Sequence, residues 1–253
     1  MKILATVLFL LTLVQVQAAE IVTNTDKKSF DAIKDYLEKN SDKSKAYKRI
    51  AFFVDTEKLE LFRKYQTQFR VRQTKTKTEI SIIIRDTKKV PVNLKRLPAR
   101  FSKIAKCDVK IIVGKGAVNY CVIKMIVDGR LAKNEVTQMF IDSPEFDKFL
   151  SASIHTNKIK RLIFENPIKP FYAVLMDGKQ YLSKEKVWTV ESWTNKDKEQ
   201  TFEVSMNTTK DTSKTDVKTM LQTLKGSGAS TTNEEKSNLV WYFSNIVKEA
   251  TNR

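Results

Sequence analysis

The feature that most limits how this chain can fold is a strict two-residue alternation in its central part. In segment 78–85, isoleucines occupy every second position from residue 80, whereas Glu79, Ser81 and Arg85 fall on the opposite side of an extended chain. Because successive side chains of a strand point to opposite faces, this pattern predicts a strand with one aliphatic, buried face and one largely polar face.

Extended segments recur along the chain, and amphipathic segments with helical spacing lie between them. The six glycines and five prolines are too few for collagen-like or proline-rich architectures. We therefore predict an α+β fold with helices at its ends and edges. Strands are predicted at residues 50–55, 69–72, 78–85, 109–113, 118–127, 135–141, 160–164, 171–176, 187–193 and 201–206. Helices are predicted at residues 26–40, 59–65, 143–154, 214–224 and 234–249.

The charged strand faces allow two architectures. Arg70 and Arg72 project together, Glu79 and Arg85 share a second face, and Lys124 lies on a third. An open antiparallel sheet with one face in water explains this pattern. A barrel of about eight strands with a charged lumen is also compatible with it, but periodicity alone favours the open sheet.

The N-terminus predicts export. Lys2 precedes an apolar run over residues 3–14, and Val16-Gln17-Ala18 has small or apolar residues at the −3 and −1 positions of a cleavage site. This is typical of a secretory signal peptide, because the run is shorter than the roughly 20 residues that span a bilayer. No later stretch is long and uncharged enough to span one, so we expect a secreted, extracellular protein.

The composition narrows the class of function. Lysine and arginine number 46 against 29 acidic residues, which gives a net charge of +17, or +16 without residues 1–18. Such a charge favours polyanionic partners, although no nucleic-acid-binding motif is present. One histidine and two cysteines cannot supply a zinc ribbon or a His cluster, and a Ser-His-Asp enzyme is disfavoured.

Two modifications follow from export. Cys107 and Cys121 flank a predicted hairpin whose turn is Gly114-Lys115-Gly116, so we expect a disulfide between the two strands. Two separate buried thiols are the alternative. Asn207-Thr208-Thr209 is a glycosylation sequon in a polar stretch, which predicts a glycan on Asn207.

A longer pattern carries a family resemblance. Phe53-Val54-Asp55-Thr56, leucines at 59 and 61, Arg70-Val71-Arg72 and Glu79-Ile80-Ser81-Ile82 together resemble the core signature of the CYTH, or triphosphate tunnel, family. The resemblance covers residues 50–85 and extends loosely over 160–193. It implies a tunnel-like antiparallel barrel, which we expect over residues 19–225. The small polar residues of 226–233 predict a linker, and the C-terminal helix within 234–253 is expected to pack on the domain.

The resemblance also implies a ligand set. Basic side chains would bind triphosphate, polyphosphate or another polyanion, and glutamates would hold Mg²⁺ or Mn²⁺, since guanidinium groups suit phosphate and carboxylates suit hard cations. The implied phosphate ligands are Arg70, Arg72, Arg85, Lys124, Lys160 and Arg161. The implied metal ligands are Glu79, Glu191 and Glu203.

The sequence departs from the family pattern in its carboxylates. The family's first strand reads Glu-x-Glu-x-Lys, but here Glu20 is followed by Val22 and Asn24, and Trp193 stands where a later glutamate is expected. Cleavage after Ala18 would leave Glu20 at a chain end, where we expect fraying. A site that loses carboxylates is expected to lose hydrolysis before it loses anion binding.

Three functions follow. The first is a secreted basic protein that binds phosphate-rich polyanions in a CYTH-like tunnel, with weak or no hydrolysis. The second is a working metal-dependent triphosphatase or polyphosphatase. The third is an extracellular protein that binds glycans, nucleic acid or membrane surfaces through its surface charge alone.

Overall fold

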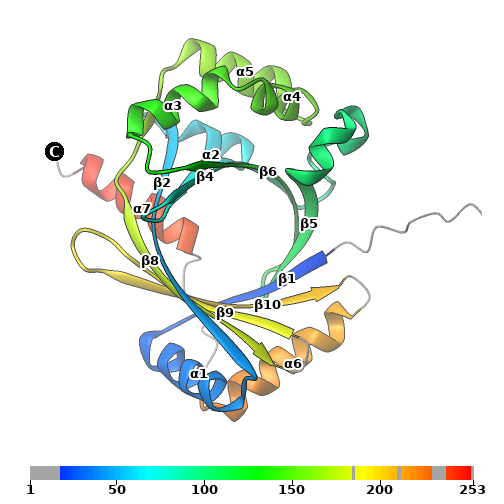
Figure 1. The fold of residues 1–253 in the computed structure, drawn as a ribbon, viewed down its shortest axis with the longest axis vertical. Helices are drawn as coiled ribbons and strands as arrows, with labels where there is room; N and C mark the ends of the chain where they lie inside the picture. Colours follow the sequence, from blue (N-terminus) through cyan, green and yellow to red (C-terminus); the bar gives the residue numbers. More distant parts are fainter. Residues whose placement is uncertain (1–17, 184–185, 210–211, 230–237, 252–253) are drawn as a thin grey trace, which may run out of the picture.

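The architecture is a closed β-barrel with helices on two sides (Figure 1). The computed structural model describes residues 18–183, 186–209, 212–229 and 238–251. The strands are β1 (Ala18–Thr25), β2 (Lys43–Thr56), β3 (Thr67–Gln73), β4 (Lys77–Asp86), β5 (Ala105–Ile112), β6 (Gly116–Asp128), β7 (Ile168–Pro170), β8 (Val174–Ser183), β9 (Lys186–Thr194) and β10 (Gln200–Thr209). The helices are α1 (Lys27–Asn40), α2 (Glu60–Tyr65), α3 (Lys133–Asp142), α4 (Pro144–Ser151), α5 (Thr156–Glu165), α6 (Ser213–Gly226) and α7 (Asn238–Thr251), with 3-10 turns η1 (Leu94–Arg96) and η2 (Ala99–Lys103).

Nine strands close the barrel in the order β2-β3-β4-β6-β5-β1-β10-β9-β8, because β2 pairs with both β3 and β8. The short strand β7 pairs with the end of β2 and with no other strand of the described ranges. Neighbours are antiparallel throughout, apart from β1 and β5, which run parallel. The predicted tunnel-like α+β barrel is therefore confirmed, and the parallel pair makes its sheet mixed.

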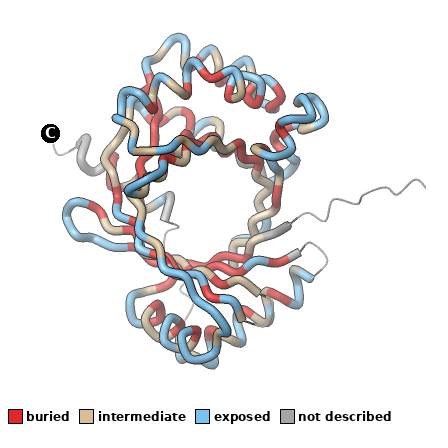
Figure 2. Tube along the Cα trace, viewed as in Figure 1, coloured by how far each residue is buried: buried red, intermediate tan, exposed pale blue. Residues whose placement is uncertain are grey.

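The two-residue alternation has a direct structural meaning. Ile80, Ile82 and Ile84 of β4 are fully buried on the outer face of the barrel, in a core shared with α3, α4 and α5. On the other side, α1 and α6 cover the outer faces of β1, β8, β9 and β10 (Figures 1 and 2). Both aliphatic cores thus lie outside the barrel wall, which leaves the polar strand faces for the lumen.

A third core closes part of the interior. Ala51 and Phe53 of β2, Met176 of β8 and Trp193 of β9 are buried against α7, whose Tyr242 donates a hydrogen bond of 2.6 Å to a backbone carbonyl of the segment before β8. In Figure 1, α7 lies beside β2 and β8. Apolar contacts therefore fill this end of the inner surface, and the charged part of the lumen lies beyond it.

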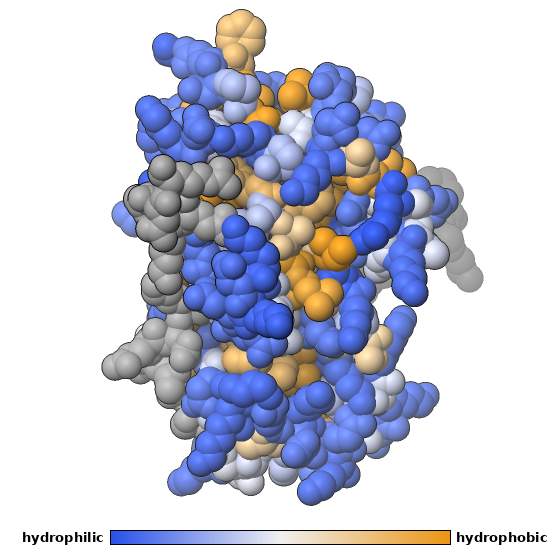
Figure 3. Space-filling view, turned by 90° about the vertical axis from the view of Figure 1, so that its left-hand side faces the viewer, coloured by the Kyte–Doolittle hydropathy of each residue, from blue (hydrophilic) through white to orange (hydrophobic). Residues whose placement is uncertain are grey.

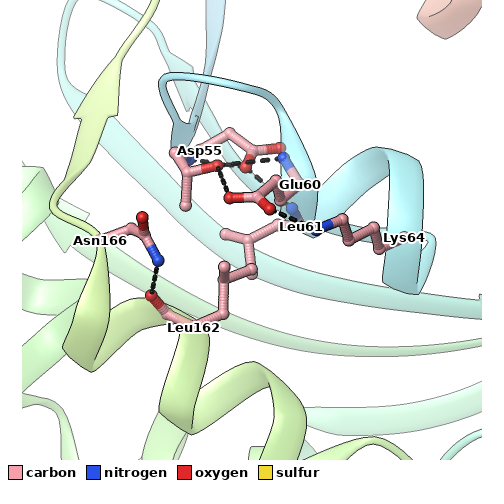
Figure 4. A network of polar contacts seen from close by, with 7 residues as sticks. Asp55, Glu60, Leu61, Lys64, Leu162 and Asn166 are labelled. Carbon is pink, nitrogen blue, oxygen red and sulfur yellow. Dashed lines mark hydrogen bonds and ion pairs between the residues drawn. The ribbon is translucent and has the colours of Figure 1, made fainter.

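The aromatic-x-Asp-Thr stretch is a structural element. The Asp55 carboxylate is buried and accepts hydrogen bonds from the backbone N–H groups of Thr56, Leu61 and Phe62, at 2.6, 3.0 and 3.0 Å. It thereby satisfies free N–H groups at the start of α2, while Glu60 pairs with Lys64 one turn on (Figure 4).

Two predicted strands are helices. Segment 135–141 forms most of α3, where Val136 and Phe140 are buried one turn apart and Glu135 accepts a hydrogen bond of 2.6 Å from the Ala132 N–H. Segment 160–164 belongs to α5, whose buried positions are Ile159 and Leu162. The prediction was wrong because both segments are too short for periodicity to distinguish a helix from a strand. Val136 and Phe140 are a single pair with helical spacing in the first segment, and Ile159, which is buried with Leu162, lies just outside the second.

Side chains cap two of the helices, and the predicted disulfide forms. The Asp26 carboxylate caps α1 by accepting the Ser29 N–H at 2.7 Å, and Ser143 caps α4, which has Pro144 in its first turn. Cys107 and Cys121 face each other in register and form a disulfide. Most of the predicted signal peptide (1–17) and part of the linker (230–233) lie outside the described residues. Within the described ranges, no helix is long and apolar enough to cross a membrane.

Candidate functional site

The lumen has a basic wall formed by β3, β4 and β6. The Glu79 carboxylate lies among three cations, with Arg70 Nη2 at 3.7 Å, Arg72 Nη1 at 3.9 Å and Lys124 Nζ at 4.0 Å. The pairing register explains this arrangement, because Arg72 lies opposite Glu79 and Arg70 lies opposite Ser81, which in turn faces Lys124. Arg85 lies on the same face of β4, six residues beyond Glu79.

These contacts are longer than hydrogen bonds, and several buried donors have no hydrogen-bond acceptor in the described part of the chain. Three buried nitrogens have no hydrogen-bond acceptor among the described residues: Arg70 Nε, Arg72 Nε and Arg85 Nη1. The buried oxygen Glu79 Oε1 likewise has no hydrogen-bond donor there. An unsatisfied buried polar group costs about 1–3 kcal/mol, and more where it is charged. The basic wall therefore contains guanidinium donors that lack acceptors among the described residues, and one of its arginines, Arg72, lines a cavity of the lumen.

The charges of this wall persist at neutral pH. Burial, reinforced by Arg72 and opposed by Glu79, lowers the pKa of Arg70 to about 9. Burial likewise lowers the pKa of Arg85 to about 10. Burial disfavours the ionised form of Glu79, but Arg70, Arg72 and Lys124 outweigh it and lower the pKa of that carboxyl. Arg70, Arg85 and Glu79 are therefore ionised at pH 7.

An acidic wall faces the basic one across the ring of strands. Glu20 of β1, Glu203 of β10 and Glu191 of β9 project into the lumen, and β1, β9 and β10 lie on the far side of the barrel from β4 and β6 (Figure 1). A cavity of about 170 Å³ lies beside the acidic wall, and Arg72 of the basic wall borders it. It is lined by Glu20, Tyr47, Arg49, Arg72, Gln180, Thr189, Glu191, Glu203 and Ser205.

Neutral donors hold Glu191. The Tyr47 hydroxyl donates to Glu191 Oε2 at 2.7 Å, and Trp193 Nε1 donates to Oε1 at 2.6 Å. The Tyr47 ring rests on Gly178, where any side chain would collide with it, and the Arg49 guanidinium lies 4.5 Å from the centre of the same ring. Both oxygens of Glu191 are therefore already hydrogen-bonded.

Lys110 links the other two carboxylates. Its Nζ lies 3.8 Å from Glu20 Oε2 and 3.7 Å from Glu203 Oε1. Burial opposes ionisation of Glu20, but Lys110, a hydrogen bond from Ser205 and the charge of Arg72 together lower the pKa of that carboxyl. For Glu203, burial dominates and the carboxylates of Glu20 and Glu191 reinforce it, so its pKa is raised despite Lys110.

The carboxylates do not fit a divalent metal in this arrangement. Within the described ranges, no group of three Asp, Glu, His or Cys side chains could hold a metal ion. Glu79 lies on the basic wall, apart from Glu191 and Glu203, so the three predicted metal ligands are not brought together. Tyr47 and Trp193 occupy Glu191, and a lysine ammonium lies at Glu203.

The structure separates the predicted phosphate ligands into two groups. Arg70, Arg72, Arg85 and Lys124 converge on the lumen. Lys160 and Arg161 lie on the outer helix α5, where they pair with Asp147 and Glu165 respectively, each at 2.6 Å. The predicted strand that would have carried them inward is a helix, so they are not part of the tunnel.

Sequence reasoning missed two groups of lumen residues. Glu20 is not at a frayed end: β1 is paired on both sides, with β10 and β5. Lys110, Tyr47 and Arg49 were not predicted as site residues. The signal for Lys110 was available, because Cys107 and Cys121 were expected on one face of the hairpin and residue 110 has the opposite parity.

Comparison with known proteins supports the fold alone. No protein-family model and no curated protein sequence matches the chain. Among solved structures, it is similar to a proposed adenylyl cyclase from Hippeastrum reported to have a dominant triphosphatase activity, with a TM-score of 0.51 and 13% identity over 90% of this chain and 96% of that one. A proposed adenylate cyclase from Bacillus halodurans has a TM-score of 0.49 and 13% identity over 86% and 93% of the two chains.

Proposed function

We propose that this chain is a divergent, secreted member of the CYTH family that binds a phosphate-rich polyanion, such as tripolyphosphate, in the lumen of its barrel. The observation that carries the proposal is the set of buried guanidinium nitrogens of Arg70, Arg72 and Arg85 without hydrogen-bond acceptors among the described residues. Its barrel shares the fold of a protein with triphosphatase activity, which supports triphosphate chemistry as the first ligand class to test.

The basic wall suits this ligand. A guanidinium group binds phosphate oxygens with two parallel hydrogen bonds and stays charged when buried. Arg70 and Arg72 lie two residues apart on β3 and serve neighbouring phosphoryl groups, while Arg85 and Lys124 extend the wall along β4 and β6. The Glu79 carboxylate partly neutralises the charges of Arg70, Arg72 and Lys124, and it competes with the anion for these cations.

Weak or absent hydrolysis follows from the other wall. Mg²⁺ and Mn²⁺ take several carboxylate or water oxygens, but Glu191 is occupied by neutral donors and Glu20 and Glu203 share a lysine. Val22 and Asn24, which replace the family's second glutamate and its lysine, are buried in β1. The chain's own residues thus bind and orient an anion but offer no established means of activating a water molecule.

The test compares tripolyphosphate affinity at low and high salt. Arg70→Ala with Arg72→Ala removes two lumen charges, whereas Lys75→Ala with Lys77→Ala removes two exposed charges from the turn of the same hairpin. Hydrogen bonds to charged groups contribute about 1.5–3 kcal/mol each, so at high salt the arginine variant should bind at least about 100-fold more weakly than the wild type. The lysine variant should match the wild type there.

Two outcomes would replace the proposal. Equal loss of binding by the wild type and the arginine variant with rising salt would favour the third function, binding through surface charge. Hydrophilic residues cover most of the face shown in Figure 3, so that route is available to polyanions. Rapid phosphate release dependent on Mg²⁺ or Mn²⁺ would instead establish the triphosphatase.

A further inference from the structure

The Lys110 side chain occupies an unusual place for a cation. Its ammonium reaches from β5 to two carboxylates on different strands, Glu20 of β1 and Glu203 of β10, at 3.8 and 3.7 Å. Its side chain is 21% exposed, against 18% for Glu203, so both lie mostly away from water. Carboxylates on neighbouring strands with a shared positive charge between them are the arrangement that a divalent cation would otherwise produce.

We infer that Lys110 is the tunnel's resident cation: its ammonium takes the position between Glu20 and Glu203 that a divalent metal would need, so the lumen binds its anion without metal. Anion binding without metal rests on the proposed function. The exclusion of a divalent cation by Lys110 does not, and it is tested without any phosphate.

Strand pairing fixes Lys110 in this position. β5 is the strand that runs parallel to β1, and in that register Lys110 lies directly beside Glu20. Three residues earlier, Cys107 is joined to Cys121 of β6 across the hairpin. The disulfide and the parallel pairing together hold the backbone from which the lysine projects, so the ammonium is a built-in part of the acidic wall.

The surroundings of the three carboxylates explain why the single ammonium of Lys110 is enough to balance the charge of the acidic wall. Glu191 needs no cation, because Tyr47 and Trp193 satisfy its two oxygens. The Ser205 side chain also helps to lower the pKa of Glu20. For Glu203, burial and the charges of Glu20 and Glu191 together outweigh the effect of Lys110 and raise the pKa of the carboxyl. Lys110 is the ion-pair partner of Glu203. A divalent ion entering here would have to displace a tethered cation from its two closest acidic partners.

The test is a Mn²⁺ titration, followed by electron paramagnetic resonance, of the purified protein without phosphate. The wild type should show no saturable site up to about 1 mM, the range of weak carboxylate sites. Lys110→Met keeps the length of the side chain but removes its charge, and it should bind Mn²⁺ at least about tenfold more tightly, because a like charge about 4 Å away is removed. Lys115→Met, on the exposed turn of the same hairpin, is the control with the same charge change and should behave as the wild type.

Further variants make the result decisive. Adding Glu203→Gln to Lys110→Met should abolish the gained site, and Lys110→Arg should keep the wild-type behaviour. Melting temperatures confirm that each variant folds, and Lys110→Gln replaces the methionine variant if that one does not. A saturable Mn²⁺ site in the wild type overturns the inference, as does a folded neutral variant that gains none. Failure of the proposed function would appear separately, as loss of salt-resistant tripolyphosphate binding with the cation results unchanged.

Discussion

The Tyr47 hydroxyl donates a hydrogen bond of 2.7 Å to Glu191 Oε2, so a carboxylate that faces the lumen is satisfied by a phenol rather than by a cation. Burial, together with the adjacent Glu191 charge, raises the pKa of Tyr47, which keeps the phenol protonated and able to donate. The bond depends on Gly178, because the Tyr47 ring fills the space that a side chain at residue 178 would need.

This dependence predicts the effect of Gly178→Ala. The added Cβ would lie 2.3 Å from Tyr47 Cζ, so the ring must move and its bond to Glu191 is lost. Overpacking costs about 1–3 kcal/mol, and we expect a fall of that size in the free energy of unfolding by urea denaturation. Tyr47→Ala removes the collision, so the double variant should be more stable than the sum of the two single effects by at least about 0.5 kcal/mol. Strict additivity would contradict this packing.

A second prediction concerns Asp55, whose carboxylate accepts three backbone N–H groups around the start of α2. Asp55→Ala leaves these donors without their acceptor and should cost about 1–3 kcal/mol of stability. Asp55→Asn keeps one acceptor oxygen and should cost less. Equal stability of the wild type and the alanine variant would contradict a capping role.

The same residue predicts a pH effect. Burial raises the pKa of Asp55 to about 6, against its ordinary value of 3.8, although the three N–H groups oppose the shift. The folded state therefore binds a proton more tightly than the unfolded state does, and the contribution of Asp55 to stability increases as the pH falls from about 6 towards 4. Asp55→Asn should lack this component, so the stability difference between the two proteins should change across that range and be constant above it.

Strand parity was enough to expect which charged residues share a strand face. Arg70 with Arg72, and Glu79 with Arg85, were assigned to the polar faces of their strands because their neighbours on the opposite faces are largely aliphatic, and the barrel buries those aliphatic faces beneath helices. Parity cannot say which strand will lie beside which. The contact between Lys110 and Glu20 depends on β5 running parallel to β1, which joins residues 90 positions apart and leaves no local signature.

Helical spacing, by contrast, was locally ambiguous. The five-residue window 160–164 reads equally as a strand, and it becomes a helix because Ile159 and Leu162 pack on the outer core. Arg161 then pairs with Glu165 on the exposed face of α5. Tertiary packing decided this segment, and with it the loss of Lys160 and Arg161 from the site.

A third prediction concerns the disulfide between Cys107 and Cys121. The bond closes a loop with a sequence separation of 14 residues, for which the expected stabilisation is about 3 kcal/mol. Cys107→Ser with Cys121→Ser should lower the free energy of unfolding by about that amount. Unfolded wild-type protein kept under non-reducing conditions should show no reactive thiol, and two thiols per chain would contradict the bond.

A fourth prediction concerns export and glycosylation, which we propose from the sequence. Asn207 is exposed on β10, and its Oδ1 accepts the Val187 N–H at 2.5 Å. A glycan would attach at Nδ2 and leave that acceptor in place. Expression in a eukaryotic secretory system should give a secreted protein with one N-glycan, removed by glycosidase and absent from Asn207→Gln. Retention inside the cell would argue against the signal peptide.

The last prediction separates the two roles open to Glu79. If Glu79 were a metal ligand for hydrolysis, Glu79→Gln would abolish metal-dependent phosphate release and leave anion affinity largely unchanged. In the structure its carboxylate is surrounded by Arg70, Arg72 and Lys124 at 3.7–4.0 Å. An incoming phosphate chain must therefore compete with it for these cations.

Removing the Glu79 charge should then have two opposite effects. The empty protein loses stability, because three partly buried cations are left without their counter-ion. Tripolyphosphate binds at least about tenfold more tightly, since a like charge within a few ångströms of the ligand disappears, and it should restore the lost melting temperature. Glu57→Gln, which breaks an exposed ion pair with Lys169, is the matched control and should change neither quantity by much. Weaker tripolyphosphate binding by folded Glu79→Gln would show that the carboxylate supports the ligand instead of competing with it. Unchanged affinity together with loss of metal-dependent phosphate release would return Glu79 to the metal-ligand role.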